Sequence, residues 1–127
     1  MKKIPKSTDF DAFAFLVGLK LAAVTFIWDY YQLLIGTEGL SVYSHPSVQF
    51  HHRTLKFGDV GYRDALCERI GSEVVNVGES ATELTIEFGD GTRFLISFRA
   101  EDRIGDGPES LVARDGMLVV GDSAPNS

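Results

Sequence analysis

In two stretches of the second half of the chain, every second residue is apolar. Leu84, Ile86 and Phe88 alternate with polar residues, and a similar spacing continues from Phe94 to Phe98. A period of two is typical of a strand with one buried face. The pattern therefore predicts strands at residues 83–88 and 92–98, with a further strand at 73–78 before them.

The turn between these strands decides which side chains face each other. A two-residue turn at Asp90-Gly91 would place Leu95 opposite Ile86 and bring a polar residue into the apolar face. A three-residue loop at 89–91 keeps both faces consistent, because it pairs apolar with apolar residues and Glu87 with Arg93. We therefore predict the three-residue loop with Gly91 in the left-handed conformation, and the pairs Ile86–Phe94, Leu84–Ile96 and Glu87–Arg93.

A different spacing precedes the strands. Tyr62, Leu66 and Ile70 are four residues apart, as on one face of a helix, and Gly71 follows as a left-handed cap. This predicts a short helix ahead of the strands. Cys67 lies beside the apolar stripe, so it is predicted to be a small core residue.

The same order of elements is predicted for the first half, because the chain resembles itself at an offset of 53 residues. Residues 11–18 then align with 64–71, with Asp, Ala and Gly at matching places. The first helix would bury Phe10, Phe13, Ala14 and Val17 and end at Gly18. A loop at 36–39 would place Ile35 opposite Leu40 and Leu33 opposite Val42.

Together these patterns predict a β-rich α+β protein. We expect two helix-plus-β-meander repeats, at about 8–57 and 61–110, whose apolar faces close into a small sandwich or a partly open barrel. Further strands are expected at 48–55 and 117–120. Residues 1–120 would form a single domain, followed by a disordered tail at 121–127.

Composition restricts the classes of function. The chain has 127 residues and a net charge of −6, which argues against a nucleic-acid partner. Its one cysteine excludes an intrachain disulfide and favours a reducing, cytoplasmic location. Residues 12–28 are mostly apolar and carry a single charge, Lys20, but that lysine and the lack of a cleavage motif argue against a membrane span or signal peptide.

The motifs of the second half resemble a group of small uncharacterised bacterial proteins. The resemblance lies in Gly71-x-x-Val74-x-x-Val77 and in the hairpin Leu84-x-Ile86-x-Phe88-x-Asp90-Gly91. The stretch Tyr31-Gln32-Leu33-Leu34 is similar to a Tyr-Gln-x-x-Leu motif in the first half of those proteins, whereas Gly36-Thr37-Glu38-Gly39 departs from their Asp-Gly turn. The resemblance implies a repeated fold and no assigned activity, and proteins of this size and style include immunity-like partners.

No catalytic or cofactor motif stands out in the sequence, and we expect no cofactor and no enzymatic activity. Ser110 lacks a nucleophile-elbow context, and the Gly105–Pro108 loop lacks the Lys-Ser/Thr ending of a phosphate loop. His45, His51 and His52 leave open a small-ligand or metal-binding module as the alternative. A third hypothesis is an enzyme that lacks a familiar motif.

Aromatic residues mark the clearest difference between the two halves. Phe26, Trp28 and Tyr30 alternate, so a continuous strand would place them on one face, whereas the aligned positions of the second half are Glu79, Ala81 and Glu83. Exposed aromatic residues are common in protein interfaces. We therefore expect a non-enzymatic soluble binding or immunity-like interaction protein that holds an unknown protein, or a second copy in a homodimer, at Phe26, Trp28 and Tyr30.

Overall fold

The computed structural model describes residues 12–121, which are built around two five-stranded antiparallel sheets. The first sheet has the order β1 (Leu21–Ile27), β2 (Tyr30–Ile35), β3 (Glu38–Val42), β9 (Glu109–Ala113) and β10 (Leu118–Gly121). The second has the order β5 (Arg53–Leu55), β4 (Ser47–Phe50), β8 (Arg93–Ser97), β7 (Glu83–Phe88) and β6 (Val74–Glu79). The predicted β-rich fold is confirmed, and the sheets are not closed into a barrel.

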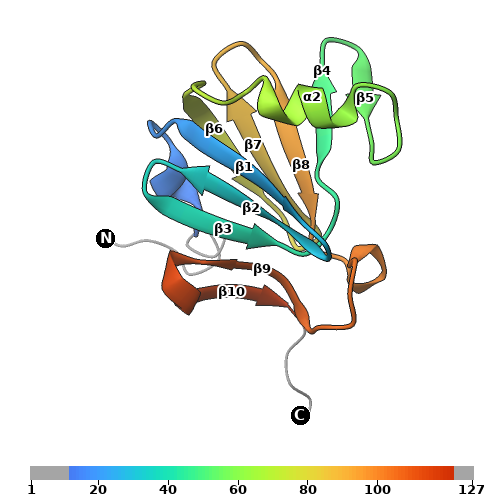
Figure 1. The fold of residues 1–127 in the computed structure, drawn as a ribbon. Coiled ribbons are helices and arrows are strands. Elements are labelled where there is room, and N and C mark those ends of the chain that lie inside the picture. The colour runs from blue at the N-terminus through green and yellow to red at the C-terminus, as the bar shows by residue number, and fades with distance from the viewer. Residues whose placement is uncertain (1–11, 122–127) are drawn as a thin grey trace.

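Helices contribute little to the described part of the chain. One short α-helix, α2 (Tyr62–Cys67), is accompanied by the 3-10 turns η1 (Ala14–Leu16), η2 (Ala100–Asp102) and η3 (Arg114–Gly116). In Figure 1, β1–β3 cross in front of β6–β8, and α2 lies over the upper end of the strands. Among residues 12–121, no helix is long and apolar enough to cross a membrane.

The first predicted helix is wrong over the residues that can be compared. Only the three residues of η1 are helical, and Val17 is already extended. Residue 10 lies outside the described residues, as does the tail predicted at 121–127 apart from Gly121, which is wrongly assigned to the tail because it belongs to a strand. The second predicted helix is present but shorter than expected, because it ends at Cys67 and leaves Ile70 half-exposed.

Each sheet combines strands from both halves of the chain. The consecutive meanders β1–β3 and β6–β8 form the larger part of each sheet. The hairpin β4–β5 then pairs with β8, and β9–β10 pairs with β3. Every sheet therefore contains three strands of one half and two strands of the other.

Several backbone features recur at the 53-residue offset. The β1–β2 and β6–β7 ladders carry an irregularity at Leu21/Ala23 and at Val74/Asn76, respectively. Gly18 and Gly71 have φ angles of 93° and 95°. Two reciprocal hydrogen bonds link these sites, Gly18 N to Val74 O at 2.8 Å and Gly71 N to Leu21 O at 2.7 Å.

One apolar core is shared by both sheets and by α2. Leu84, Ile86 and Phe88 point into it from β7, and Leu33 and Ile35 do so from β2. Each fully buried side chain of this size contributes roughly 1.5–3 kcal/mol through removal from water. The core therefore fixes which face of each strand points inward.

The predicted register of the β7–β8 hairpin is confirmed in all three pairs, Ile86–Phe94, Leu84–Ile96 and Glu87–Arg93. Gly91 has a φ of 90°, as the three-residue loop requires. The hairpin of the first half differs from the prediction by two residues, because Leu33 pairs with Leu40 and Ile35 with Glu38. The tighter turn at Gly36-Thr37 produces this register, and Gly36 has a φ of 62°.

The strand predicted at 48–55 is two strands. β4 and β5 form a hairpin whose turn is His51-His52, and His51 adopts a left-handed φ of 56°. His51 and His52 therefore lie at the tip of this hairpin and not along a strand.

The last strand, predicted at 117–120, runs from Leu118 to Gly121.

Candidate partner-binding site

The three aromatic residues predicted to bind a partner lie around the β1–β2 turn. Trp28 occupies the turn itself and is 83% exposed. Phe26 pairs with Tyr31, whereas Tyr30 pairs with Ile27. The expectation that all three share one face is wrong, because the chain reverses at Trp28 and places Phe26 and Tyr30 on opposite faces.

Tyr30 belongs to a separate aromatic contact. Its ring stacks on Tyr43 with 5.3 Å between the ring centroids. Phe26 instead contacts Tyr31 edge to face at 5.6 Å. The structure therefore brings Phe26 and Trp28 together and leaves Tyr30 on the other side of the sheet.

Phe26 and Trp28 border a surface pocket of about 290 Å³, hereafter the aromatic pocket. Its apolar wall is formed by Phe26, Ile27, Trp28, Tyr31, Phe57 and Ile104. Two further side chains, His45 and Arg63, complete the lining. These residues come from the β1–β2 hairpin, the segment before β4, the segment before α2, α2 itself and the loop after η2.

The floor of the pocket is held by a row of hydrogen-bonded side chains. The Tyr31 hydroxyl lies 2.7 Å from His45 Nδ1 and 3.3 Å from the Tyr62 hydroxyl. Tyr62 donates its proton to the backbone carbonyl of Pro46. The row connects β2, α2 and the segment that leads into β4, so it fixes three walls of the pocket relative to one another.

Burial favours the uncharged forms of these groups. It raises the pKa of Tyr62, with a further increase from its hydrogen bond to Tyr31. Burial also raises the pKa of Tyr31, against the lowering effects of Tyr62 and Arg63. It lowers the pKa of His45, so this imidazole is neutral at pH 7. The polar row can therefore support an apolar site without introducing charge.

Phe57 forms the outer wall. Its ring stacks on His45 with a centroid distance of 3.8 Å and meets Tyr62 edge to face at 6.2 Å. It is nevertheless 54% exposed. One side of the ring is thus held in place while the other remains available for contact.

Arg63 is the charged residue of the pocket. Its guanidinium lies over the Phe26 ring, 5.6 Å from the centroid, which is a favourable cation–π arrangement. The ion pairs between described residues are Arg69–Asp90, Arg93–Glu87 and Arg99–Glu101. None of these pairs uses Arg63, so no described carboxylate forms a salt bridge with it.

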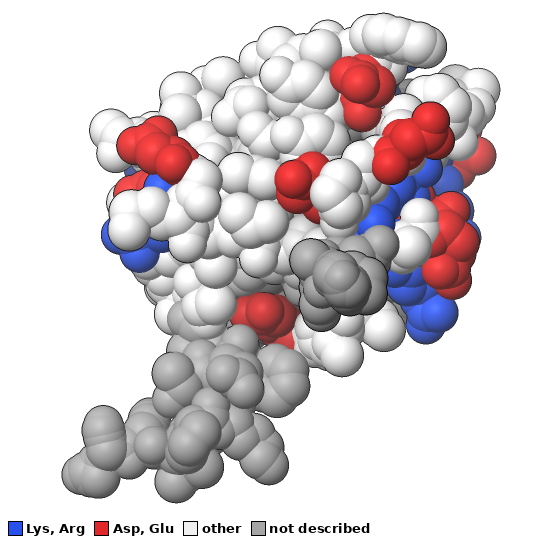
Figure 2. Space-filling view, turned by 90° about the horizontal axis from the view of Figure 1, so that it is seen from below, with Lys and Arg blue, Asp and Glu red and all other residues white. Residues whose placement is uncertain are grey.

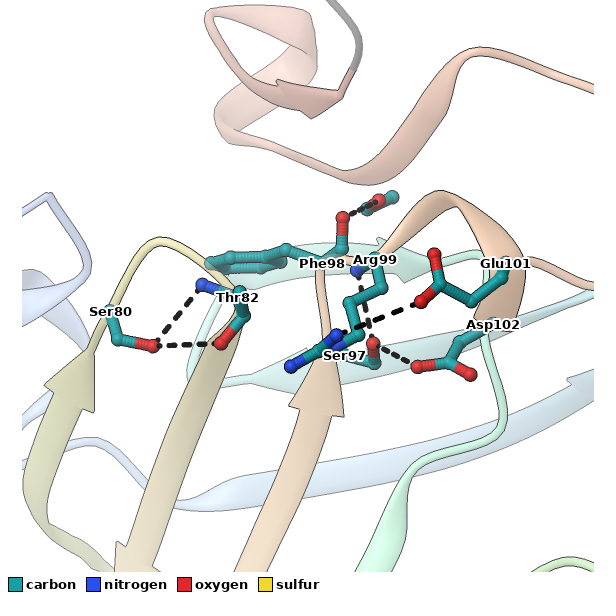
Figure 3. Close-up of polar contacts among 8 residues, drawn as sticks. Ser80, Thr82, Ser97, Phe98, Arg99, Glu101 and Asp102 are labelled. Atoms are coloured by element: carbon teal, nitrogen blue, oxygen red, sulfur yellow. Dashed lines mark hydrogen bonds and ion pairs between the residues drawn. The ribbon is translucent and has the colours of Figure 1, made fainter.

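A polar groove of about 600 Å³ lies on the other side of His45 and Phe57. Figure 3 shows part of its wall at the end of β8, where Ser97 contacts Asp102 at 2.5 Å and Arg99 pairs with Glu101 at 3.6 Å. The Arg99 backbone N–H also donates to Ser97 Oγ. These groups satisfy one another, which stabilises the η2 segment beside the aromatic pocket.

The three histidines of the alternative prediction do not come together. His45 precedes β4, whereas His51 and His52 follow it, which corresponds to roughly 15–20 Å along an extended chain. Within residues 12–121, no group of three or more His, Cys, Asp or Glu side chains is arranged to hold a metal ion.

The other reactive side chains have structural surroundings. Ser110 is buried, donates to the Phe98 carbonyl at 3.0 Å and accepts from Arg103 Nε at 3.1 Å. The prediction that Cys67 is a core residue is wrong, because it is exposed. Helix α2 buries Tyr62, Ala65 and Leu66, and this stripe leaves the next position facing solvent.

Charge is unevenly spread over the surface. On the face shown in Figure 2, Lys and Arg are confined to the margins, whereas Asp and Glu also lie within the face and uncharged residues dominate. No broad basic area interrupts this face.

No protein-family model matches this sequence, and no curated protein or solved structure matches it at a significant level.

Proposed function

We propose that the protein is a non-enzymatic binding protein that holds a partner protein at the aromatic pocket. The observation that carries this proposal is the position of Trp28, 83% exposed at the rim of a pocket with a hydrogen-bonded floor. A large exposed aromatic side chain beside a preorganised pocket is typical of an interaction hot spot. Tyr30, also expected at this site, is not part of it.

The fold supports such a role. We infer that the chain contains two copies of one unit, at about 8–57 and 61–110, because the ladder irregularities, the positive-φ glycines and the reciprocal hydrogen bonds recur at one offset. Only the first copy carries aromatic residues around the turn of its first hairpin, because Glu79, Ala81 and Glu83 occupy the matching positions of the second copy. A single domain of this kind would act as a rigid scaffold that presents one specialised turn, in the cytoplasm and in the manner of an immunity-like partner.

The test is capture of the partner from native lysate by the immobilised protein, followed by mass spectrometry. Trp28→Ala should abolish capture of the specific partner, whereas Met117→Ala should not. Met117 is a matched control because it is 88% exposed and lies before β10, away from the residues of the pocket. Capture that is insensitive to Trp28→Ala would contradict the proposal.

The partner could also be a second copy of the chain. Size-exclusion chromatography with light scattering distinguishes this case, because a dimer that dissociates in Trp28→Ala and persists in Met117→Ala would identify self-association at the pocket. A monomer that captures another protein through Trp28 would identify a different partner.

A further inference from the structure

The chemistry of the partner follows from the composition of the aromatic pocket. Its lining contains no carboxylate, its histidine is neutral at pH 7 and Arg63 supplies its formal charge. This local balance is the reverse of the whole chain, whose net charge is −6. The pocket therefore combines an apolar wall with one cation.

Covering the pocket would remove Arg63 from water. A guanidinium that loses its hydration without gaining an anion is strongly unfavourable. The Phe26 ring compensates only in part, because it contacts one face of the guanidinium. The edge of the planar group retains N–H donors whose geometry matches a carboxylate. An occupant that spans Trp28 and Phe57 has to satisfy these donors as well.

The pocket also limits the size of the occupant. A volume of about 290 Å³ is at the lower end of the range for sites that enclose a whole small molecule. It suits one large apolar side chain, with the rest of the ligand lying outside on the exposed rings of Trp28 and Phe57. A peptide segment meets this requirement.

Acidic residues nearby restrict the negative charge that the partner can carry. Asp59 and Asp64 line the adjoining hollow on the other side of Arg63, and Asp29 follows Trp28 in the turn. A run of acidic residues would be repelled by these side chains. A single carboxylate placed at Arg63 avoids that repulsion.

We propose, on the basis of the function proposed above, that the partner presents a peptide segment with one aromatic or large aliphatic side chain next to one Asp or Glu. The apolar side chain enters the aromatic pocket against Phe57 and Trp28. The neighbouring carboxylate accepts hydrogen bonds from the Arg63 guanidinium.

Trp28 allows a direct test because it is the single tryptophan of the chain. The probes are the capped peptides Gly-Phe-Glu-Gly, Gly-Phe-Gln-Gly and Gly-Phe-Lys-Gly, none of which absorbs at the wavelength that excites tryptophan. Binding is measured as a change in tryptophan fluorescence. The Glu peptide should bind about 10- to 100-fold more tightly than the Gln peptide, as expected for a hydrogen bond to a charged group, and the Lys peptide most weakly.

Arg63→Gln should remove the preference for Glu over Gln. Arg53→Gln is the matched control, because Arg53 lies over Phe50 at 5.7 Å in a similar stacking contact and does not line the pocket. This control should retain the preference. Thermal unfolding of both variants verifies that they are folded.

The result that overturns the inference is equal binding of the Glu and Gln peptides, or no binding of any peptide to the folded protein. The two proposals fail in different experiments. Partner capture that is lost in Trp28→Ala but unchanged in Arg63→Gln contradicts this inference alone. Partner capture that is unchanged in Trp28→Ala contradicts the proposed function.

Discussion

The hydrogen-bonded floor of the aromatic pocket makes a quantitative prediction for Tyr62→Phe. This substitution removes one oxygen atom from a side chain that is only 3% exposed. The carbonyl of Pro46 loses its donor, and the Tyr31 hydroxyl loses a neighbour 3.3 Å away. A buried polar group left without a partner costs about 1–3 kcal/mol. We expect the free energy of unfolding to fall by about 2 kcal/mol, within that range.

The assay is urea denaturation followed by far-UV circular dichroism, because the exposed Trp28 is a poor reporter of core packing. Tyr30→Phe is the matched control, since Tyr30 is only half-buried and its ring contact with Tyr43 does not need the hydroxyl. The control should change stability by less than about 0.5 kcal/mol. If Tyr62→Phe is as stable as Tyr30→Phe, the row from His45 to Pro46 does not hold the pocket together.

Two further predictions concern the β7–β8 loop. Gly91→Ala should lower the free energy of unfolding by about 1–2 kcal/mol in the same urea assay, because φ is 90° while no atom lies within 4 Å of an added Cβ. Gly105→Ala is the control, because Gly105 has no positive φ and an added Cβ would meet only Asp29, at 4.0 Å. It should leave the free energy of unfolding nearly unchanged. Equal effects of the two substitutions would refute a conformational origin of the Gly91→Ala effect. Asp90→Asn should cost about 0.5–1 kcal/mol at pH 7, a modest value because the carboxylate is half-exposed. Burial acts to raise the pKa of Asp90, but hydrogen bonds from Thr92 and Arg69 outweigh it and lower the pKa below 3.8. The difference in free energy of unfolding between wild type and Asp90→Asn should therefore be complete above that value and disappear as the pH falls through the lowered pKa. Urea denaturation of wild type and Asp90→Asn at pH 7 and at low pH measures this difference. A difference in stability that persists in acid would exclude the ionised carboxylate as its source.

The two hairpins show what alternation can and cannot predict. In β7–β8 the competing registers differed by one residue, which would have exchanged the two faces, so the apolar pattern selected the observed pairs. In β2–β3 the predicted and observed registers differ by two residues, and a shift of two leaves every side chain on its face. The pattern carries no information on that choice, which is made by the positive φ of Gly36 in the tighter turn.

The aromatic pocket could be predicted only in part. The aromatic difference between the halves predicts Phe26 and Trp28, but alternation alone does not show that the chain turns at Trp28, so it wrongly groups Tyr30 with them. His45 is singled out by the sequence only as a candidate metal or small-ligand residue, and Phe57 and Arg63 are unremarkable in their own sequence context. They meet Phe26 and Trp28 through the tertiary arrangement of the β1–β2 hairpin, the loop before α2 and the helix itself.

The exchange of strands between halves explains why the site lies where it does. β4–β5 leaves the first half to pair with β8, so the chain must cross from one sheet to the other between β3 and β4. His45 lies on this crossing and Phe57 lies between β5 and α2. Both segments lie outside the named strands, and loops on a rigid scaffold are where binding residues concentrate. The aromatic pocket is therefore built where these two segments and α2 meet the first hairpin of the chain.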